Sequence, residues 1–202
     1  MIRILAAGLA PALLLAPAAA QDVTKAYVQV HGGVFAPTAD EFSVPLVTTG
    51  GGDERASFDL DPDLGYAVGG LVGYEVARGL SVEAEVTYRS YGIGGIDGAD
   101  ADFGDVEAAA FLLNGVYTLT VPLLAAPYVG AGAGYITPLG DTDEFEGGFA
   151  WQVKAGVAWP VGVGRIVTEA SYLDAATLDE DSFGGELDYG GVTGLIGYRF
   201  AF

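Results

Sequence analysis

The sequence predicts an all-β fold, an eight-stranded antiparallel up-and-down barrel that crosses a membrane. Three observations support this prediction. Apolar and polar residues alternate with a period of two along several segments, which is the geometry of a β-strand. Aromatic residues recur near both ends of these segments, and the connections between them alternate between short and long. A composition rich in glycine, with 32 glycines in 202 residues, argues against a helical protein.

The first 20 residues have the features of a secretory signal. Arg3 gives a short positive start, an apolar run covers residues 4–16, and small residues precede Gln21. The run is too short to span a bilayer, which requires roughly 20 apolar residues. We therefore expect cleavage between Ala20 and Gln21, which leaves residues 21–202 as a single barrel domain.

Composition limits the possible partners. The chain has no cysteine, so its stability after export does not depend on disulfides. Its 27 acidic and 8 basic residues give a formal charge of −19. Non-specific binding to nucleic acid depends on clustered Lys and Arg that neutralise phosphates. Nucleic acid is therefore excluded as a partner.

Eight segments carry the strand pattern in order along the chain. They lie near 24–36, 64–77, 80–92, 106–119, 127–138, 148–160, 164–174 and 189–202. Four connections are long or acidic (37–63, 93–105, 139–147 and 175–188), and three are short (77–79, 120–126 and 161–164). In an antiparallel meander, this order places every long loop at one end and both termini at the other. Short periplasmic turns and longer extracellular loops are the plan of an outer-membrane barrel.

The aromatic positions indicate which face meets lipid. Trp151 and Trp159 share an apolar face of the segment 148–160. Their separation is about 27 Å along a strand, or about 20 Å along the axis of a tilted barrel. We expect two aromatic girdles that bound an apolar band, formed by Tyr74, Tyr88, Tyr117, Tyr135, Trp151, Trp159 and Tyr172. The alternative interpretation is a water-soluble periplasmic barrel with these aromatic residues in its core.

The opposite faces of the strands are small and polar. Alternation places seven charged residues toward the lumen: Glu75, Glu83, Glu85, Arg89, Lys154, Glu169 and Arg199. Eight strands enclose an interior just wide enough for side chains, and an unpaired charge there is costly. We expect ion pairs and hydrogen bonds across the lumen, which form a polar plug. The alternative is a gate or a narrow conductive path.

Two segments carry a family resemblance. The stretch Pro127–Tyr135 (PYVGAGAGY), the ending Gly197–Phe202 (GYRFAF) and Asn114 before a Gly-Val-Tyr resemble the small OmpA-like outer-membrane β-barrel family of Gram-negative bacteria. The resemblance implies that Gly197, Tyr198, Phe200 and Phe202 form a C-terminal signal for the barrel-assembly machinery. The polar residue usual at the start of that signal is replaced by Leu195. Family members with a peptidoglycan-binding domain continue past the barrel, so that role is not expected here.

His31 is the only histidine and therefore the only imidazole base. It falls in the first predicted strand, on the inward side with Gln29. The sequence contains no nucleophile elbow and no catalytic serine context. We expect a hydrogen-bonded interior histidine, and an outer-membrane hydrolase that uses His31 is the remote alternative.

Three acidic clusters fall in the predicted loops. They are Asp59, Asp61 and Asp63; Asp97, Asp100 and Asp102; and Asp141, Asp143, Glu144 and Glu146. The first cluster has the alternate carboxylates of a calcium loop but lacks the glycine and the glutamate of an EF-hand. We expect a solvated acidic surface, with calcium binding as the alternative.

These observations predict a non-enzymatic outer-membrane protein without a cofactor. The barrel anchors four acidic extracellular loops in a structural or surface-interaction role, because specific recognition is usually carried by loops. A narrow pore or small-solute conduit is the second interpretation. The expected partners are outer-membrane lipid, the barrel-assembly machinery during biogenesis and a surface partner on the acidic loops.

Overall fold

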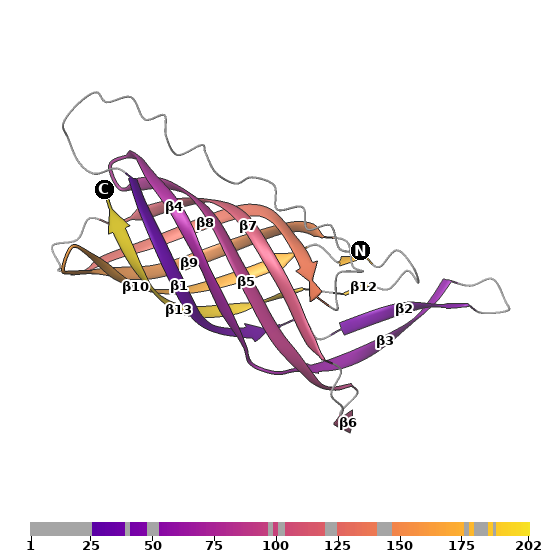
Figure 1. The fold of residues 1–202 in the computed structure, drawn as a ribbon. Helices are drawn as coiled ribbons and strands as arrows, with labels where there is room; N and C mark the ends of the chain where they lie inside the picture. The colour runs from indigo at the N-terminus through magenta and orange to yellow at the C-terminus, as the bar shows by residue number, and fades with distance from the viewer. Residues whose placement is uncertain are drawn as a thin grey trace, which may run out of the picture.

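Eight long strands close into a barrel (Figure 1). The computed structural model describes residues 26–38, 41–47, 53–96, 99–100, 104–119, 125–140, 147–175, 178–179, 186–187 and 189–202. The barrel strands are β1 (Ala26–Pro37), β4 (Gly65–Ala77), β5 (Leu80–Ile96), β7 (Asp105–Thr118), β8 (Ala126–Leu139), β9 (Gly148–Val161), β10 (Gly164–Ala175) and β13 (Gly190–Ala201). Each barrel strand pairs antiparallel with the next one along the chain. The predicted fold class is confirmed.

The last strand returns to the first and closes the sheet. β1 and β13 pair from Tyr27 opposite Ala201 to Pro37 opposite Gly191. Closure leaves no unpaired edge, so every backbone polar group of the wall is satisfied within the sheet. The described residues contain no helix that is long and apolar enough to cross a membrane.

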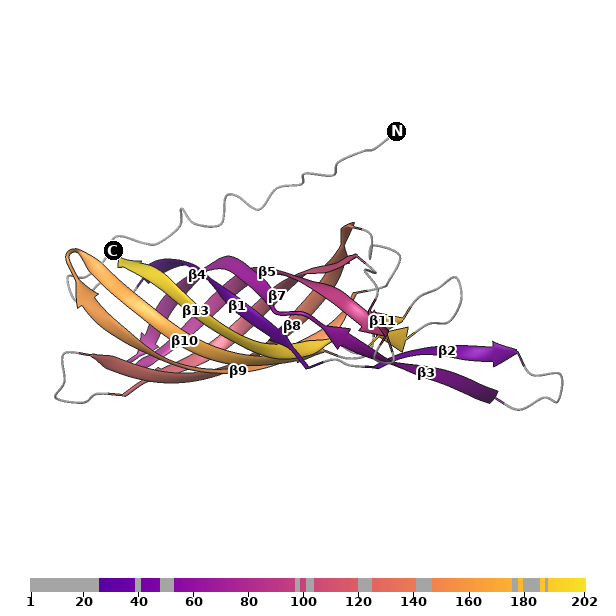
Figure 2. The ribbon, with the colours of Figure 1, turned by 90° about the horizontal axis from the view of Figure 1, so that it is seen from below.

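A hairpin extends from the end of the barrel that carries the long connections (Figures 1 and 2). It consists of β2 (Glu41–Val47) and β3 (Asp53–Pro62), which pair antiparallel. The sequence prediction treated 37–63 as a loop, and the structure corrects this. Phe42, Val44 and Leu46 do alternate with strand period, but Pro45 interrupts the pattern, and a proline usually argues against a strand.

Three short strands lie at the same end of the barrel as the hairpin. β6 (Ala99–Asp100) pairs with β5, and β11 (Leu178–Asp179) pairs with β12 (Glu186–Leu187). β12 also pairs with β2, and β3 pairs with β5. Backbone hydrogen bonds therefore connect the hairpin to β5 through β3. They also connect it, through β12, to the segment between β10 and β13.

The outer surface of the barrel is apolar. Val30 is 63% exposed, Leu113 61% and Ile196 60%, which would be unfavourable in water and suits the lipid interior. The aromatic residues predicted for the girdles lie on this outer face at two levels. Tyr88, Tyr135, Trp151 and Tyr172 lie toward the long connections, whereas Tyr74, Tyr117 and Trp159 lie toward the short turns together with Tyr198, Phe200 and Phe202.

The lumen is filled in layers. The part toward the long connections holds a buried apolar cluster that includes Phe35, Tyr91 and Tyr189, whose ring centroids are 5.8 to 6.2 Å apart. The sequence prediction of a small and polar interior did not include this aromatic layer. A second, smaller cluster around Val116 and Tyr128 lies toward the short turns. Polar and charged side chains occupy the space between the two clusters.

Candidate functional site

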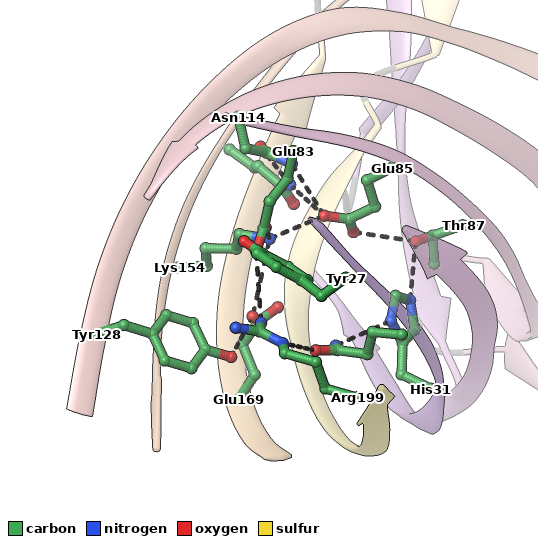
Figure 3. Close-up of polar contacts among 12 residues, drawn as sticks. Tyr27, His31, Glu83, Glu85, Thr87, Asn114, Tyr128, Lys154, Glu169 and Arg199 are labelled. Carbon is green, nitrogen blue, oxygen red and sulfur yellow. Dashed lines mark hydrogen bonds and ion pairs between the residues drawn. The ribbon is translucent and has the colours of Figure 1, made fainter. Parts of the chain in front are cut away.

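The candidate site is the buried polar network in the middle of the lumen (Figure 3). Every barrel strand except β4 contributes a side chain to it: Tyr27, Gln29 and His31 from β1; Glu83, Glu85 and Thr87 from β5; Asn114 from β7; Tyr128 from β8; Gln152 and Lys154 from β9; Glu169 from β10; and Arg199 from β13. Period-two alternation places all of them on the inward face.

Lys154 is the centre of this network. Its Nζ lies 2.6 Å from Glu83 Oε2, 3.0 Å from Glu85 Oε2 and 3.8 Å from Glu169 Oε2. The side chains of Lys154 and Glu83 are fully buried. One ammonium group therefore connects β9 to β5 and β10 across the lumen. Such contacts offset the desolvation of the charges because they are short and accompanied by further hydrogen bonds.

The three carboxylates also accept hydrogen bonds from other side chains. The Tyr27 hydroxyl donates to Glu83 Oε1 over 2.7 Å, and Arg199 Nη2 lies 3.3 Å from the same oxygen. The Tyr128 hydroxyl donates to Glu169 Oε2 over 2.6 Å. Glu85 Oε2 accepts from the side-chain amides of Asn114 and Gln152, at 3.0 and 3.1 Å. With two cations against three carboxylates, the network carries one excess negative charge that these neutral donors stabilise.

His31 lies within a chain of hydrogen bonds that fixes its tautomer. Arg199 Nε donates to Gln29 Oε1 over 3.0 Å, so the Gln29 amide nitrogen faces His31 Nδ1 at 3.4 Å. Thr87 Oγ1 donates to Glu85 Oε1 over 3.0 Å, so it accepts from His31 Nε2 at 3.2 Å. His31 is thus neutral, with the proton on Nε2. Because its acceptor nitrogen is already engaged, the imidazole is not placed to act as a general base.

Two glycines make room for the tyrosines of the network. A Cβ atom at Gly73 would overlap the Tyr27 ring, and one at Gly156 would overlap the Tyr128 ring. Each glycine lies on the strand adjacent to its tyrosine, directly opposite it in the register. The absence of a side chain lets each ring lie across the neighbouring strand and place its hydroxyl on a buried carboxylate.

Two of the charged residues expected in the network lie apart from it. Glu75 is half-buried near the short turns, where its Oε1 accepts from the backbone N–H of Gly79 over 3.2 Å. Arg89 is 1% exposed and lies in the aromatic layer toward the long connections, with its guanidinium carbon 5.8 Å from the centre of the Phe35 ring. Its Nε and Nη1 have no hydrogen-bond partner, and no carboxylate among the described residues forms an ion pair with it. Alternation gives the face of a residue but not its depth along the axis.

Sequence reasoning also left out Tyr27 and Tyr128. The predicted network contains only charged residues, whereas these two tyrosines are only 9% and 2% exposed and also point inward. The signal was present in their spacing. Tyr27 shares its parity with Gln29 and His31, and Tyr128 shares its parity with the glycines that follow it.

Other predicted sites are described only in part. Asp61 and Asp63 are exposed, and the structure gives only the backbone of Asp59 and Asp100. Asp97, Asp102 and the whole third acidic cluster lie outside the described residues, as do Ala20 and Gln21 of the expected cleavage site. Among the side chains that the structure describes, no group of three or more His, Asp or Glu could hold a metal ion. Calcium binding therefore stays a prediction.

The fold is that of known outer-membrane proteins. It is similar to the crystal structure of the outer membrane protein OprG from Pseudomonas aeruginosa, with a TM-score of 0.57 and 15% identity over 89% of this chain and 97% of that one. Neisserial surface protein A is similar with a TM-score of 0.57 and 16% identity, over 88% of this chain and 97% of that one. The outer membrane protein AlkL, solved in lipid bilayers, has a TM-score of 0.55 and 17% identity, over 91% of this chain and 94% of that one.

Sequence comparison gives the family directly. No curated protein sequence matches the chain at a significant level. The sequence model of the outer membrane protein beta-barrel domain matches residues 5–200. Together with the closed barrel and its apolar outer surface, this match shows that the chain belongs to the outer membrane protein β-barrel domain family and resides in the lipid bilayer of the outer membrane.

Proposed function

We propose that this protein is a non-enzymatic outer-membrane barrel whose lumen is closed and whose role is carried by its extracellular end. The observation that carries the proposal is the position of Lys154 Nζ, within 3.8 Å of carboxylates on two other strands. A free path for solutes through an eight-stranded barrel would have to pass this bridge. The aromatic layer around Phe35, Tyr91 and Tyr189 supports a second closure nearer the outside.

The absence of an enzymatic role rests on the surroundings of His31. Its two ring nitrogens are occupied by Gln29 and Thr87, and the Thr87 hydroxyl donates to a carboxylate rather than to the imidazole. In an activated nucleophile, the hydroxyl donates its proton to the imidazole, whereas here the Thr87 hydroxyl accepts from it. A hydrolase activity lost in His31→Ala, but retained in the equally buried Thr193→Ala, would overturn this part of the proposal.

The proposed role of the barrel is to hold its extracellular segments in place for a surface partner. The β2–β3 hairpin extends from that end, and most acidic residues of the chain lie in the segments 37–63, 93–105, 139–147 and 175–188. A partner with a basic surface fits this charge. During biogenesis we propose cleavage of the signal after Ala20 and recognition of Gly197, Tyr198, Phe200 and Phe202 by the barrel-assembly machinery.

Single-channel conductance tests the closed lumen. Refolded protein without residues 1–20, shown to be folded by its heat-dependent migration on a detergent gel, should leave a planar bilayer silent. Lys154→Ala combined with Glu83→Ala should give measurable openings, because it removes the bridge. Arg78→Ala, a charge deletion at an exposed turn position, is the matched control and should stay silent.

A narrow conduit is the second candidate, and one observation favours it. A hollow of about 340 Å³ enters the barrel from the end with the short turns and reaches Arg199 of the network. Steady discrete openings of the unmodified protein would mean that the charges line a path, and would replace the closed-lumen proposal by this one.

A further inference from the structure

The end of the barrel opposite the acidic loops carries a hollow with a different charge. Its volume is about 340 Å³, in the range of sites that hold small ligands. It lies between two short turns, β4–β5 and β9–β10, and the closing strand β13. Among the described residues, the lining includes Arg78, Arg165 and Arg199 and a single carboxylate, that of Glu75. A chain with a formal charge of −19 therefore has a locally positive cavity at this end.

Two of the three arginines form no ion pair within the described structure, and the third, Arg199, is paired with Glu83. Arg78 and Arg165 are exposed, and neither forms an ion pair with a carboxylate of the described residues. Glu75 accepts from the backbone N–H of Gly79, which ties its carboxylate to the turn. Gly79 has a φ of 76°, so this turn conformation favours glycine and holds Arg78 beside the hollow.

Arg199 forms the inner wall of the hollow and is held rigidly. Its side chain is 10% exposed, and its guanidinium lies 4.4 Å from the centre of the Tyr27 ring. Its Nε donates to Gln29, and its Nη2 contacts Glu83. A guanidinium has five N–H groups, so donors remain for a ligand in the hollow. Ser81 and Thr118 add hydroxyl groups to the lining.

We propose that this hollow is a binding site for a small oxyanion, with phosphate or carboxylate chemistry, at the periplasmic mouth of the barrel. Arg78 and Arg165 bind the anion from the rim, and Arg199 faces it from inside. Guanidinium groups suit phosphate and carboxylate oxygens because their planar N–H pairs match these oxygens in geometry as well as in charge. The anion comes either from a free solute or from the headgroup of an anionic lipid of the inner leaflet. The proposal is independent of whether the lumen conducts.

Amide NMR of the refolded protein in nanodiscs tests the site and separates the two sources. In zwitterionic phosphatidylcholine nanodiscs, inorganic phosphate at constant ionic strength should shift the amide signals of Gly79 and Gly164, which line the hollow. Gly94, at the far end of β5, should not shift. In a second arm without phosphate, the lipid is changed to include phosphatidylglycerol. A shift in the first arm assigns a solute anion, and a shift in the second arm alone assigns a headgroup.

Variants decide whether the rim arginines bind the anion. R78Q/R165Q should weaken binding at least about tenfold, because two charge-assisted contacts are removed. R55Q makes a single such charge change on β3, at the other end of the molecule, and should bind normally. R78K/R165K keeps the charges and should retain part of the affinity, which also covers the case in which the glutamine variant does not fold. No shift at Gly79 and Gly164 in either arm, or equal affinity in R78Q/R165Q, would overturn the proposal.

Discussion

Replacement of Lys154 by alanine is the most direct test of the buried network. The change removes the cation that lies 2.6, 3.0 and 3.8 Å from three carboxylates, and leaves Arg199, on Glu83, as the only cation of the network. Removal of one partner of a buried pair typically costs about 3–5 kcal/mol. With a urea dependence of about 2 kcal/mol per molar, a loss of about 4 kcal/mol lowers the unfolding midpoint by about 2 M.

Tryptophan fluorescence during urea unfolding in lipid vesicles measures this midpoint. Trp151 and Trp159 lie on the same strand as Lys154, on its lipid-facing side, so their emission reports the loss of the barrel from the membrane. Arg78→Ala is the control, because an exposed charge deletion should change stability by no more than about 0.5 kcal/mol.

A double variant separates charge balance from lost packing. Lys154→Met with Glu83→Gln restores the original excess of one negative charge, and should recover most of the stability lost in Lys154→Ala. An unchanged midpoint in Lys154→Ala would refute the network as a stabilising element. A double variant that is less stable than the single variant would show that charge balance is not the cause of the loss.

Three further changes probe other parts of the barrel. Arg89→Met should leave the urea midpoint unchanged or raise it, because it removes a buried charge that has no ion-pair partner among the described residues. A fall of more than about 1 kcal/mol in the free energy of unfolding would mean that this charge is compensated. Gly156→Val should lower the midpoint by displacing the Tyr128 ring, whereas Gly194→Ala, where a Cβ has ordinary contacts, should not; equal midpoints would show that the ring has room to move. Deletion of Tyr198–Phe202 should abolish outer-membrane assembly, judged by heat-dependent migration of membrane fractions, and normal levels of the deleted form would argue against a terminal signal.

The wall of the barrel could be predicted from sequence because its geometry repeats. Each strand alternates with a period of two, and lipid accepts only apolar and aromatic side chains on one face. The predicted first strand, 24–36, is observed as Ala26–Pro37, and the predicted sixth, 148–160, as Gly148–Val161. Closure of the barrel could be predicted for two reasons. An even number of strands lets the last strand pair antiparallel with the first, and an unpaired sheet edge is costly in lipid.

The contents of the lumen could be predicted only by face. Glu83, Glu85 and Lys154 share a layer because strand tilt and register bring them to the same depth, and neither quantity can be read from a single sequence. For the same reason, the sequence did not show that Arg89 lies at a different depth from the carboxylates expected to pair with it. The β2–β3 hairpin was not predicted for a different reason. Pro45 interrupts the alternation of apolar and polar residues in β2, and a proline usually argues against a strand.

The way in which Arg199 is held bears on how the barrel opens. Arg199 lies on the closing strand, but it contacts Gln29 on the first strand and Glu83 on the third. Separation of β13 from β1 would therefore break backbone hydrogen bonds and, at the same time, the ion pair between Arg199 and the buried Glu83. The seam between β1 and β13 is thus also held by side chains in the lumen, which favours slow, cooperative separation of the two strands over gradual fraying. The contacts of Arg199 with Gln29 and Glu83 therefore favour a long lifetime of the folded barrel in the membrane.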